Sequence, residues 1–271
     1  MRLVGTAVEL EAAAPSVSTY RPEYQRTDAR CASFERLLLG CIARYEARTV
    51  CDIGGGANPM LPREYLETHQ MRCVLLDICG EELAKAPPGY SQMVADIAAP
   101  HLPAAGERFD LVFSRMLAEH VRSGEHFHRN VFRLLRPGGV AVHCFPTLYS
   151  LPFLVNRAMP ERWADAALRL IQPRDRHQYA KFPAYYDWCR GPSPRAWRRL
   201  EGLGYEVVQY TGLFGHPYYG ESGPLAWLQQ SVTRALLRHP VNALTSYAFL
   251  VLRRPVVPSF RETEAEAVAA A

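Results

Sequence analysis

Residues 50–59 read VCDIGGGANP, an apolar segment that ends in Asp52 and runs into three consecutive glycines. Glycine lets backbone N–H groups approach a ligand because no Cβ stands in the way, and Pro59 suits the first turn of a helix. A second apolar segment ends in Asp77, where a carboxylate can accept hydrogen bonds from ribose hydroxyls. The stretch therefore predicts a nucleotide-binding turn between a strand and a helix.

A third apolar segment ends in Asp96. Acids that close successive strands lie together at the carboxyl edge of a parallel sheet, where open α/β sheets bind ligands. A simpler interpretation is that each acid only caps the helix that follows it. The succession of three acids favours the shared site.

Two later segments identify a family, namely FDLVFSRMLAEHV at 109–121 and LLRPGGV at 134–140. Together with the opening stretch they resemble class I S-adenosylmethionine-dependent methyltransferases over about residues 45 to 145. The family pattern is acid-x-Gly-x-Gly-x-Gly, which Asp52, Gly54 and Gly56 match, while Asn58 stands at the last glycine. Asn tolerates a left-handed backbone conformation well, so the departure is mild.

The resemblance implies S-adenosylmethionine as the cofactor. Asp77 would bind the ribose hydroxyls, Asp96 the adenine amine with Ile97 against the ring, and Ser114 and Met116 would lie below the methionine chain. Tyr24, with Tyr20 and Arg26, would close the site over the carboxylate. The expected cofactor-binding residues are Asp52, Gly54, Gly55, Gly56, Asp77, Ile78, Asp96, Ile97, Ser114, Met116 and Tyr24.

A nicotinamide-dependent dehydrogenase is the main competing interpretation. It would carry Gly-x-Gly-x-x-Gly, but the sixth position counted from Gly54 is Pro59. The chain also lacks the Tyr-x-x-x-Lys pair of short-chain dehydrogenases. Both observations favour S-adenosylmethionine, which has no phosphate for a glycine-lined helix start to bind.

Strand-like and helix-like segments alternate along the chain, which predicts a doubly wound α/β sheet. The family resemblance implies a Rossmann-like fold with seven strands, the last antiparallel, and we expect a helical or loop cap inserted after the fifth strand. The expected divisions are an N-terminal arm and helix closing the cofactor site (1–45), an S-adenosylmethionine-binding half (46–145), a substrate-binding cap (146–194), a C-terminal half of the sheet (195–254) and a flexible tail (255–271).

Glu119 and His120 follow the fourth expected strand and are the candidate catalytic residues. Related quinone-biosynthesis O-methyltransferases carry acid-x-x-acid-His there and bind a divalent metal, but Met116 replaces the first acid, so we expect no metal. His120 is a candidate general base, needed only if the acceptor loses a proton. The alternative is that His120 packs locally.

The expected cap is rich in aromatic residues and arginines, and arginine pairs suit carboxylate or phosphate recognition. We therefore expect a small-molecule acceptor with an apolar body and an anionic group such as a phosphate, diphosphate or carboxylate. The alternative is a small helical cap whose aromatic residues form its own core. The candidate substrate-binding residues are Arg174, Arg176, Lys181, Tyr185, Tyr149, His216 and Tyr218.

Composition limits the remaining classes. A net charge of +4 over 271 residues is too mild to indicate a nucleic-acid partner. The seven cysteines occur singly, which favours a reducing, cytoplasmic setting, and neither a signal peptide nor a membrane-spanning run is apparent, so we expect no membrane partner. The oligomeric state stays open, with a homodimer as one option. The function expected is small-molecule methyl transfer in biosynthesis; the alternatives are a regulatory or scaffold protein that binds S-adenosylmethionine and a protein or RNA methyltransferase.

Overall fold

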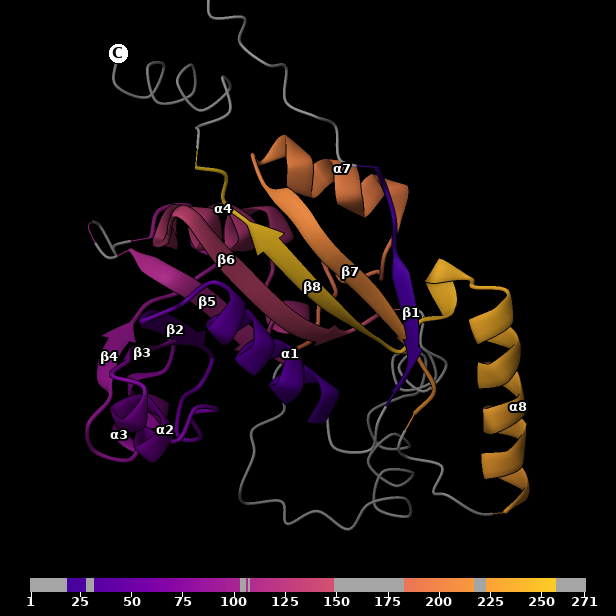
Figure 1. Cartoon of the computed structure of the whole chain (residues 1–271), viewed down its shortest axis with the longest axis horizontal. Coiled ribbons are helices and arrows are strands. Elements are labelled where there is room, and N and C mark those ends of the chain that lie inside the picture. Colours follow the sequence, from indigo (N-terminus) through magenta and orange to yellow (C-terminus); the bar gives the residue numbers. More distant parts are fainter. Residues whose placement is uncertain are drawn as a thin grey trace, which may run out of the picture.

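An eight-stranded sheet forms the centre of the molecule in a computed structural model (Figure 1). The structure describes residues 19–27, 32–102, 106, 108–148, 183–216 and 223–256. The strands are β1 (Glu23–Arg26), β2 (Thr49–Ile53), β3 (Arg72–Asp77), β4 (Ser91–Val94), β5 (Phe109–Arg115), β6 (Leu135–Pro146), β7 (Glu206–Phe214) and β8 (Tyr247–Arg253). Within these segments the helices are α1 (Ala32–Arg44), α2 (Arg63–Thr68), α3 (Gly80–Ala84), α4 (Gly124–Leu134), α7 (Pro194–Gly202) and α8 (Pro224–Arg238), with short 3₁₀ helices η1 (Ala118–His120) and η3 (Asn242–Leu244).

The strand order is β1-β7-β8-β6-β5-β2-β3-β4. Every pairing is parallel except those of β8, which runs antiparallel between β6 and β7. This arrangement confirms the predicted doubly wound fold with its antiparallel last strand. The central parallel strands β2, β3 and β5 are buried on both faces, which explains why β3 and β5 read as continuous apolar runs.

The described residues form eight strands, one more than the seven expected, because β1 joins the sheet. It lies within the segment expected to be an arm and pairs in parallel with β7, with Tyr24 opposite Gly212. β1 is short and mostly exposed, and it joins the sheet through its backbone, so its sequence carries no apolar alternation that would have indicated a strand.

Helices cover both faces of the sheet and build two cores. Buried residues of α1, α2 and α3 pack against one face, with Phe34 and Leu38 of α1 fully buried there. Residues of α4 and α7 pack against the other face, including Phe127 and Trp197. Helix α8 lies beyond these layers at the β1 edge (Figure 1).

Two element boundaries differ from the expected ones near the glycine turn. The helix expected from Pro59 begins at Arg63, because Pro62 before it has an extended backbone, with φ −62° and ψ 148°. Strand β4 ends at Val94, two residues before Asp96. Among the helices of the described segments, none combines the length and the apolar character required to cross a bilayer.

Candidate cofactor and acceptor site

The glycine turn follows the carboxyl end of β2, the strand that lies between β3 and β5. Gly54 and Gly56 adopt positive φ angles of 77° and 43°, which side chains disfavour. A Cβ on Gly54 would stand 2.3 Å from Cδ1 of Leu117, and one on Gly55 would stand 2.8 Å from Cγ of Asp52. The turn is therefore a backbone cradle that has no room for side chains, as a ligand that contacts the main chain requires.

Asp52 lies beneath this cradle and is buried. Its Oδ2 accepts a 3.0 Å hydrogen bond from the backbone N–H of Met60. Desolvation by burial raises the pKa of this carboxyl to about 7, although the Met60 hydrogen bond and the charge of Arg115 oppose the rise. A cationic group on a ligand in the cradle would favour the ionised form of Asp52.

Asp77 and Asp96 both stand at the carboxyl edge and both accept a local hydrogen bond. Oδ1 of Asp77 accepts from the Cys79 N–H at 2.9 Å, and Oδ1 of Asp96 accepts from the Ala98 N–H at 2.8 Å. Each carboxylate therefore caps the turn that follows it and retains a second oxygen as an acceptor. Acceptors of this kind at the ends of β3 and β4 fit the hydroxyl and amine donors of an adenosine.

The two isoleucines expected near the adenine have opposite exposures. Ile97 is buried in the core, where its carbonyl accepts a hydrogen bond from Asn130, so the expectation that it would lie against the ring is wrong. Ile78 is 65% exposed, directly after Asp77. Ile78 is thus the isoleucine whose side chain is available to a planar ring.

Ser114 and Met116, at the end of β5, also differ in their exposure to solvent. Ser114 is fully buried and its hydroxyl is 2.8 Å from Nδ1 of His143 on β6, so the prediction that it contacts the methionine chain is wrong. Met116 is partly exposed and has a positive φ of 55°. Met116 therefore stays at the edge where the prediction placed it.

Tyr24 is not brought to the glycine turn. It lies on β1, which is separated from β2 by β7, β8, β6 and β5. Its ring stacks on Phe214 at 5.5 Å and its hydroxyl donates to Asn242, while the Tyr20 ring contacts Trp197. The described part of the N-terminal arm thus pairs with the β7 edge instead of closing the cofactor site.

Glu119 and His120 occupy η1, just beyond the carboxyl end of β5. Only 3% of Glu119 is exposed, and its Oε2 has no hydrogen-bond partner among the described residues. Desolvation by burial raises the pKa of this carboxyl to about 8. His120 is partly exposed, with Nε2 3.6 Å from Oε1 of Glu119 and Nδ1 2.9 Å from the carbonyl oxygen of Pro183.

The segment 183–190 docks against η1, and sequence reasoning missed most of its contacts. The N–H groups of Tyr185 and Tyr186 both donate to the carbonyl of Glu119, at 2.7 and 3.0 Å. The hydroxyl of Tyr185 accepts from Nε of Arg122, whose guanidinium lies 5.6 Å from the same ring. Arg122 follows the fourth-strand motif directly, and that position was the only signal that could have included it in the site.

Gly124 explains how closely this segment packs. A Cβ at this position would stand 2.7 Å from Cβ of Trp188, and the Gly124 N–H donates to Oδ2 of Asp187 at 2.8 Å. The start of α4 therefore holds the segment next to the Glu119–His120 pair.

The other candidate substrate residues are described only in part. His216 is buried just past the end of β7, where desolvation lowers its pKa to about 4, and its carbonyl accepts from the Gln229 side chain. The structure separates β7 from β5 by β8 and β6 and does not bring His216 to η1. Outside the described residues lie Tyr149, Arg174, Arg176, Lys181 and Tyr218.

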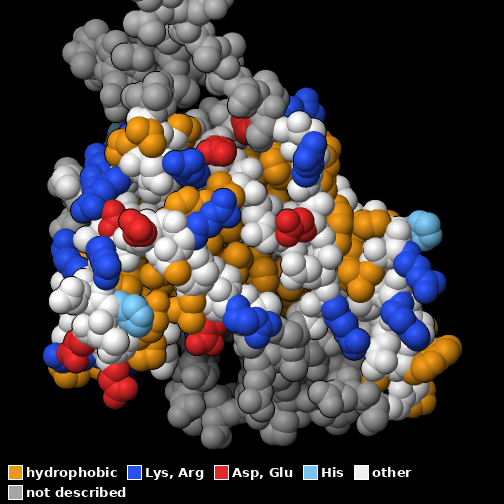
Figure 2. Space-filling view, viewed as in Figure 1, with side chains coloured by type: hydrophobic (Ala, Val, Ile, Leu, Met, Phe, Trp, Pro, Cys, Tyr) orange, Lys and Arg blue, Asp and Glu red, His pale blue; other side chains and the backbone are white. Residues whose placement is uncertain are grey.

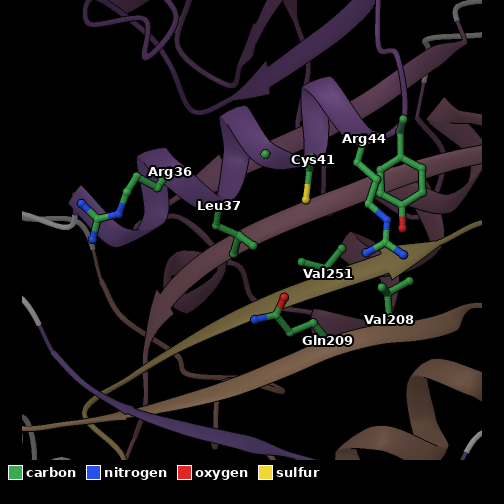
Figure 3. A pocket seen from close by; sticks show the side chains of 9 residues that line it. Arg36, Leu37, Cys41, Arg44, Val208, Gln209 and Val251 are labelled. Carbon is green, nitrogen blue, oxygen red and sulfur yellow. The ribbon is translucent and has the colours of Figure 1, made fainter.

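A pocket elsewhere on the molecule does not coincide with these residues. It lies between α1 and the strands β7 and β8, where Arg36 and Arg44 flank Leu37, Val208 and Val251 (Figure 3). None of the expected site residues lines it. Within the described segments, no three His, Cys, Asp or Glu side chains converge as metal ligands would.

Comparison with known proteins gives matches over most of the fold. Residues 23–210 match a family described as a methyltransferase domain. The chain is 30% identical over 161 residues to a malonyl-(acyl-carrier protein) O-methyltransferase of Enterobacter lignolyticus, covering 57% of this chain and 62% of that one. It is 29% identical over 128 residues to a ubiquinone biosynthesis O-methyltransferase of Rhizobium etli, covering 45% and 44%. The chain thus spans about half the length of the curated relatives that it matches.

Among solved structures, the (4+2)-cyclase SpnF superposes with a TM-score of 0.50 at 14% identity, over 88% of both chains. This likeness concerns the fold alone. A cyclase on the same fold shows that the architecture does not by itself determine the reaction.

Proposed function

This chain belongs to the methyltransferase-domain family of S-adenosylmethionine-dependent enzymes, and on that premise we propose that it methylates an oxygen atom of a small-molecule metabolite that carries an anionic group. The relatives with O-methyltransferase names support oxygen as the acceptor atom. A carboxylate, a phosphate or a diphosphate would each satisfy the proposed anionic group.

The residues at the carboxyl edge fit the cofactor of this family. The backbone of Gly54 and Gly56 would contact the methionine portion, with Asp52 below it, while Asp77 would accept from the ribose and Asp96 from the adenine amine. S-adenosylmethionine, when bound, supplies a methyl carbon already activated by a sulfonium. The chain then has to orient the acceptor oxygen and exclude water.

The Glu119–His120 pair carries the proposal for the acceptor side. Burial raises the pKa of the Glu119 carboxyl to about 8, which favours its protonated form at neutral pH. A protonated carboxyl can donate a hydrogen bond, and Oε2 of Glu119 has no partner among the described residues. An acceptor carboxylate or phosphate oxygen is a suitable partner for such a donor. His120, partly exposed beside it, can take a proton from an acceptor hydroxyl.

The two kinds of acceptor oxygen make different demands on His120. A hydroxyl has to lose a proton, so His120→Gln should lower kcat by about 10²- to 10⁴-fold for a phenolic acceptor. A carboxylate is already deprotonated and should be nearly indifferent to the variant. His101→Gln, at an exposed histidine before β5, is the matched control.

A direct test uses methyl-labelled S-adenosylmethionine and a cell extract separated into small-molecule, RNA and protein fractions. The proposal expects label in small molecules that bind an anion exchanger before the reaction. Label only in RNA or protein would contradict it. Cofactor binding without any turnover would favour a regulatory or scaffold protein.

A further inference from the structure

Helix α8 has an exposed apolar stripe that no described residue covers. Trp227 is 66% exposed, Leu228 53% and Val232 49%. Single exposed apolar residues are common on protein surfaces, but three within six residues of one helix form a contiguous patch. On the other side of the helix, Ala226 and Thr233 are buried, which fixes the orientation of α8 on the body of the protein.

A basic stripe lies beside the apolar one. Leu228, Val232 and Ala235 follow at intervals of four and three residues, so they share one face of the helix. Exposed Arg234 and Arg238 lie on the adjoining face, which they share with Trp227, so the tryptophan stands where the basic stripe borders the apolar one. Figure 2 shows hydrophobic and basic side chains together over α8, with no acidic side chain among them on this side of the molecule.

The charged residues of this region are all basic. No Asp or Glu occurs between Glu221 and Glu262, a stretch that includes the whole of α8 and β8. Two further apolar side chains, Val241 and Leu244, are about half exposed just after the helix. Apolar and cationic residues without acids, with a tryptophan among them, are typical of helices that lie in the interface of an anionic membrane.

We propose that α8 binds the surface of an anionic lipid bilayer, lying in the plane of the interface. Leu228, Val232 and Trp227 enter the boundary between headgroups and acyl chains, and Arg234 and Arg238 contact the lipid phosphates. This contact is peripheral and replaces the expectation that the chain has no membrane partner. It does not depend on the identity of the methyl acceptor.

A second copy of the chain fits this surface less well. A two-fold contact through α8 would place Arg234 and Arg238 of one copy against the same residues of the other, and the helix offers no carboxylate to neutralise them. An anionic membrane supplies the opposite charge without a specific partner.

The position of α8 in the topology gives membrane binding a functional purpose. Helix α8 lies in the connection between the carboxyl end of β7 and the start of β8. These two strand ends are neighbours, with Leu213 opposite Tyr247. The β7–α8–β8 connection thus belongs to the same edge of the sheet as the glycine turn. The ends of α8 therefore lie near that edge, and a bilayer bound by the helix would hold an acceptor with an apolar body close to it.

The test is flotation of the purified full chain with vesicles of phosphatidylcholine alone and of phosphatidylcholine with about one third phosphatidylglycerol. We expect binding to the anionic vesicles and its loss when the salt is raised from about 0.05 M to about 0.5 M. Replacing both Arg234 and Arg238 with Ser should weaken the partition coefficient about 30-fold. Trp227→Ser should weaken it about tenfold.

Two variants serve as matched controls. Arg195→Ser with Arg198→Ser removes the same charge from the exposed side of α7 and should retain the wild-type partition within about threefold. Trp227→Phe should retain binding but lose the blue shift in tryptophan emission that vesicles produce. Absence of binding at low salt, an equal loss in the α7 control, or a wild-type dimer that the α8 variants dissociate in sedimentation would each overturn the proposal.

Discussion

Replacing Glu119 with Gln should change how the stability of the protein depends on pH. Burial raises the pKa of this carboxyl from 4.5 to about 8 in the folded chain. Between these values the folded state keeps the proton while the unfolded state has lost it. Since the unfolded state then binds fewer protons, the free energy of unfolding falls as pH rises from about 4.5 to about 8.

The size of the effect follows from the shift. Each pH unit in this window costs about 1.4 kcal/mol, so the loss attributable to Glu119 is about 3 kcal/mol at pH 7 and about 5 kcal/mol above pH 8. Gln has nearly the same shape and no charge at any pH. The free energy of unfolding of the variant should therefore rise relative to that of the wild type by about 1.4 kcal/mol per pH unit. Any constant difference from exchanging a hydroxyl for an amide leaves this slope unchanged.

Urea unfolding of both proteins at pH 5, 6, 7 and 8 measures this slope by linear extrapolation. Glu125→Gln, an exposed carboxylate on α4, is the matched control for the loss of one negative charge. A difference between E119Q and wild type that stays constant within about 0.5 kcal/mol from pH 5 to pH 8 would refute the reasoning. It would show that Glu119 ionises in the folded state as readily as in the unfolded one.

Three further predictions concern the cofactor edge and the core. Asp77→Ala should raise the Kd for S-adenosylhomocysteine by about 10- to 100-fold in calorimetry, because a charged acceptor is lost; an unchanged Kd would remove Asp77 from the site. Gly54→Ala should abolish that binding, and Leu117→Ala in the same chain should restore part of it, since the new Cβ would otherwise stand 2.3 Å from the leucine side chain; failure of the second change to help would point to backbone strain alone. Burial lowers the pKa of His128 to about 3, so stability falls as pH drops below about 6.5, where the unfolded histidine takes up a proton; His128→Phe should flatten this acid limb in thermal melts recorded from pH 7 to pH 4, and an equally steep limb would contradict the assignment.

The sequence predicted the elements whose physics is local. The glycine turn and the apolar runs of β3 and β5 each carry their signal within a few residues. Pro224 in the first turn of α8 and the helical spacing of its apolar residues are signals of the same local kind.

The predictions that were wrong concern residues whose environment depends on contacts with residues distant in the sequence. The side chain of Ser114 faces the core because His143, 29 residues later, lies opposite it on β6, and a register shift between Phe109 and Leu111 sets which face each β5 residue takes. Ile97 is buried because β4 ends early and α4 covers the residues that follow. Strand β1 depends on β7 for its existence, so no pattern within four residues could reveal it.

The absence of a side chain at Gly54 allows the glycine turn and the start of η1 to pack directly against each other. Leu117 packs against the turn that we propose holds the methyl donor, and two residues later η1 carries Glu119, which we propose meets the acceptor. A displacement of the turn should therefore shift Leu117, and with it the start of η1. With these proposed roles, we expect the donor to bind before the acceptor, because the donor would fix the turn against which Leu117 and the start of η1 pack.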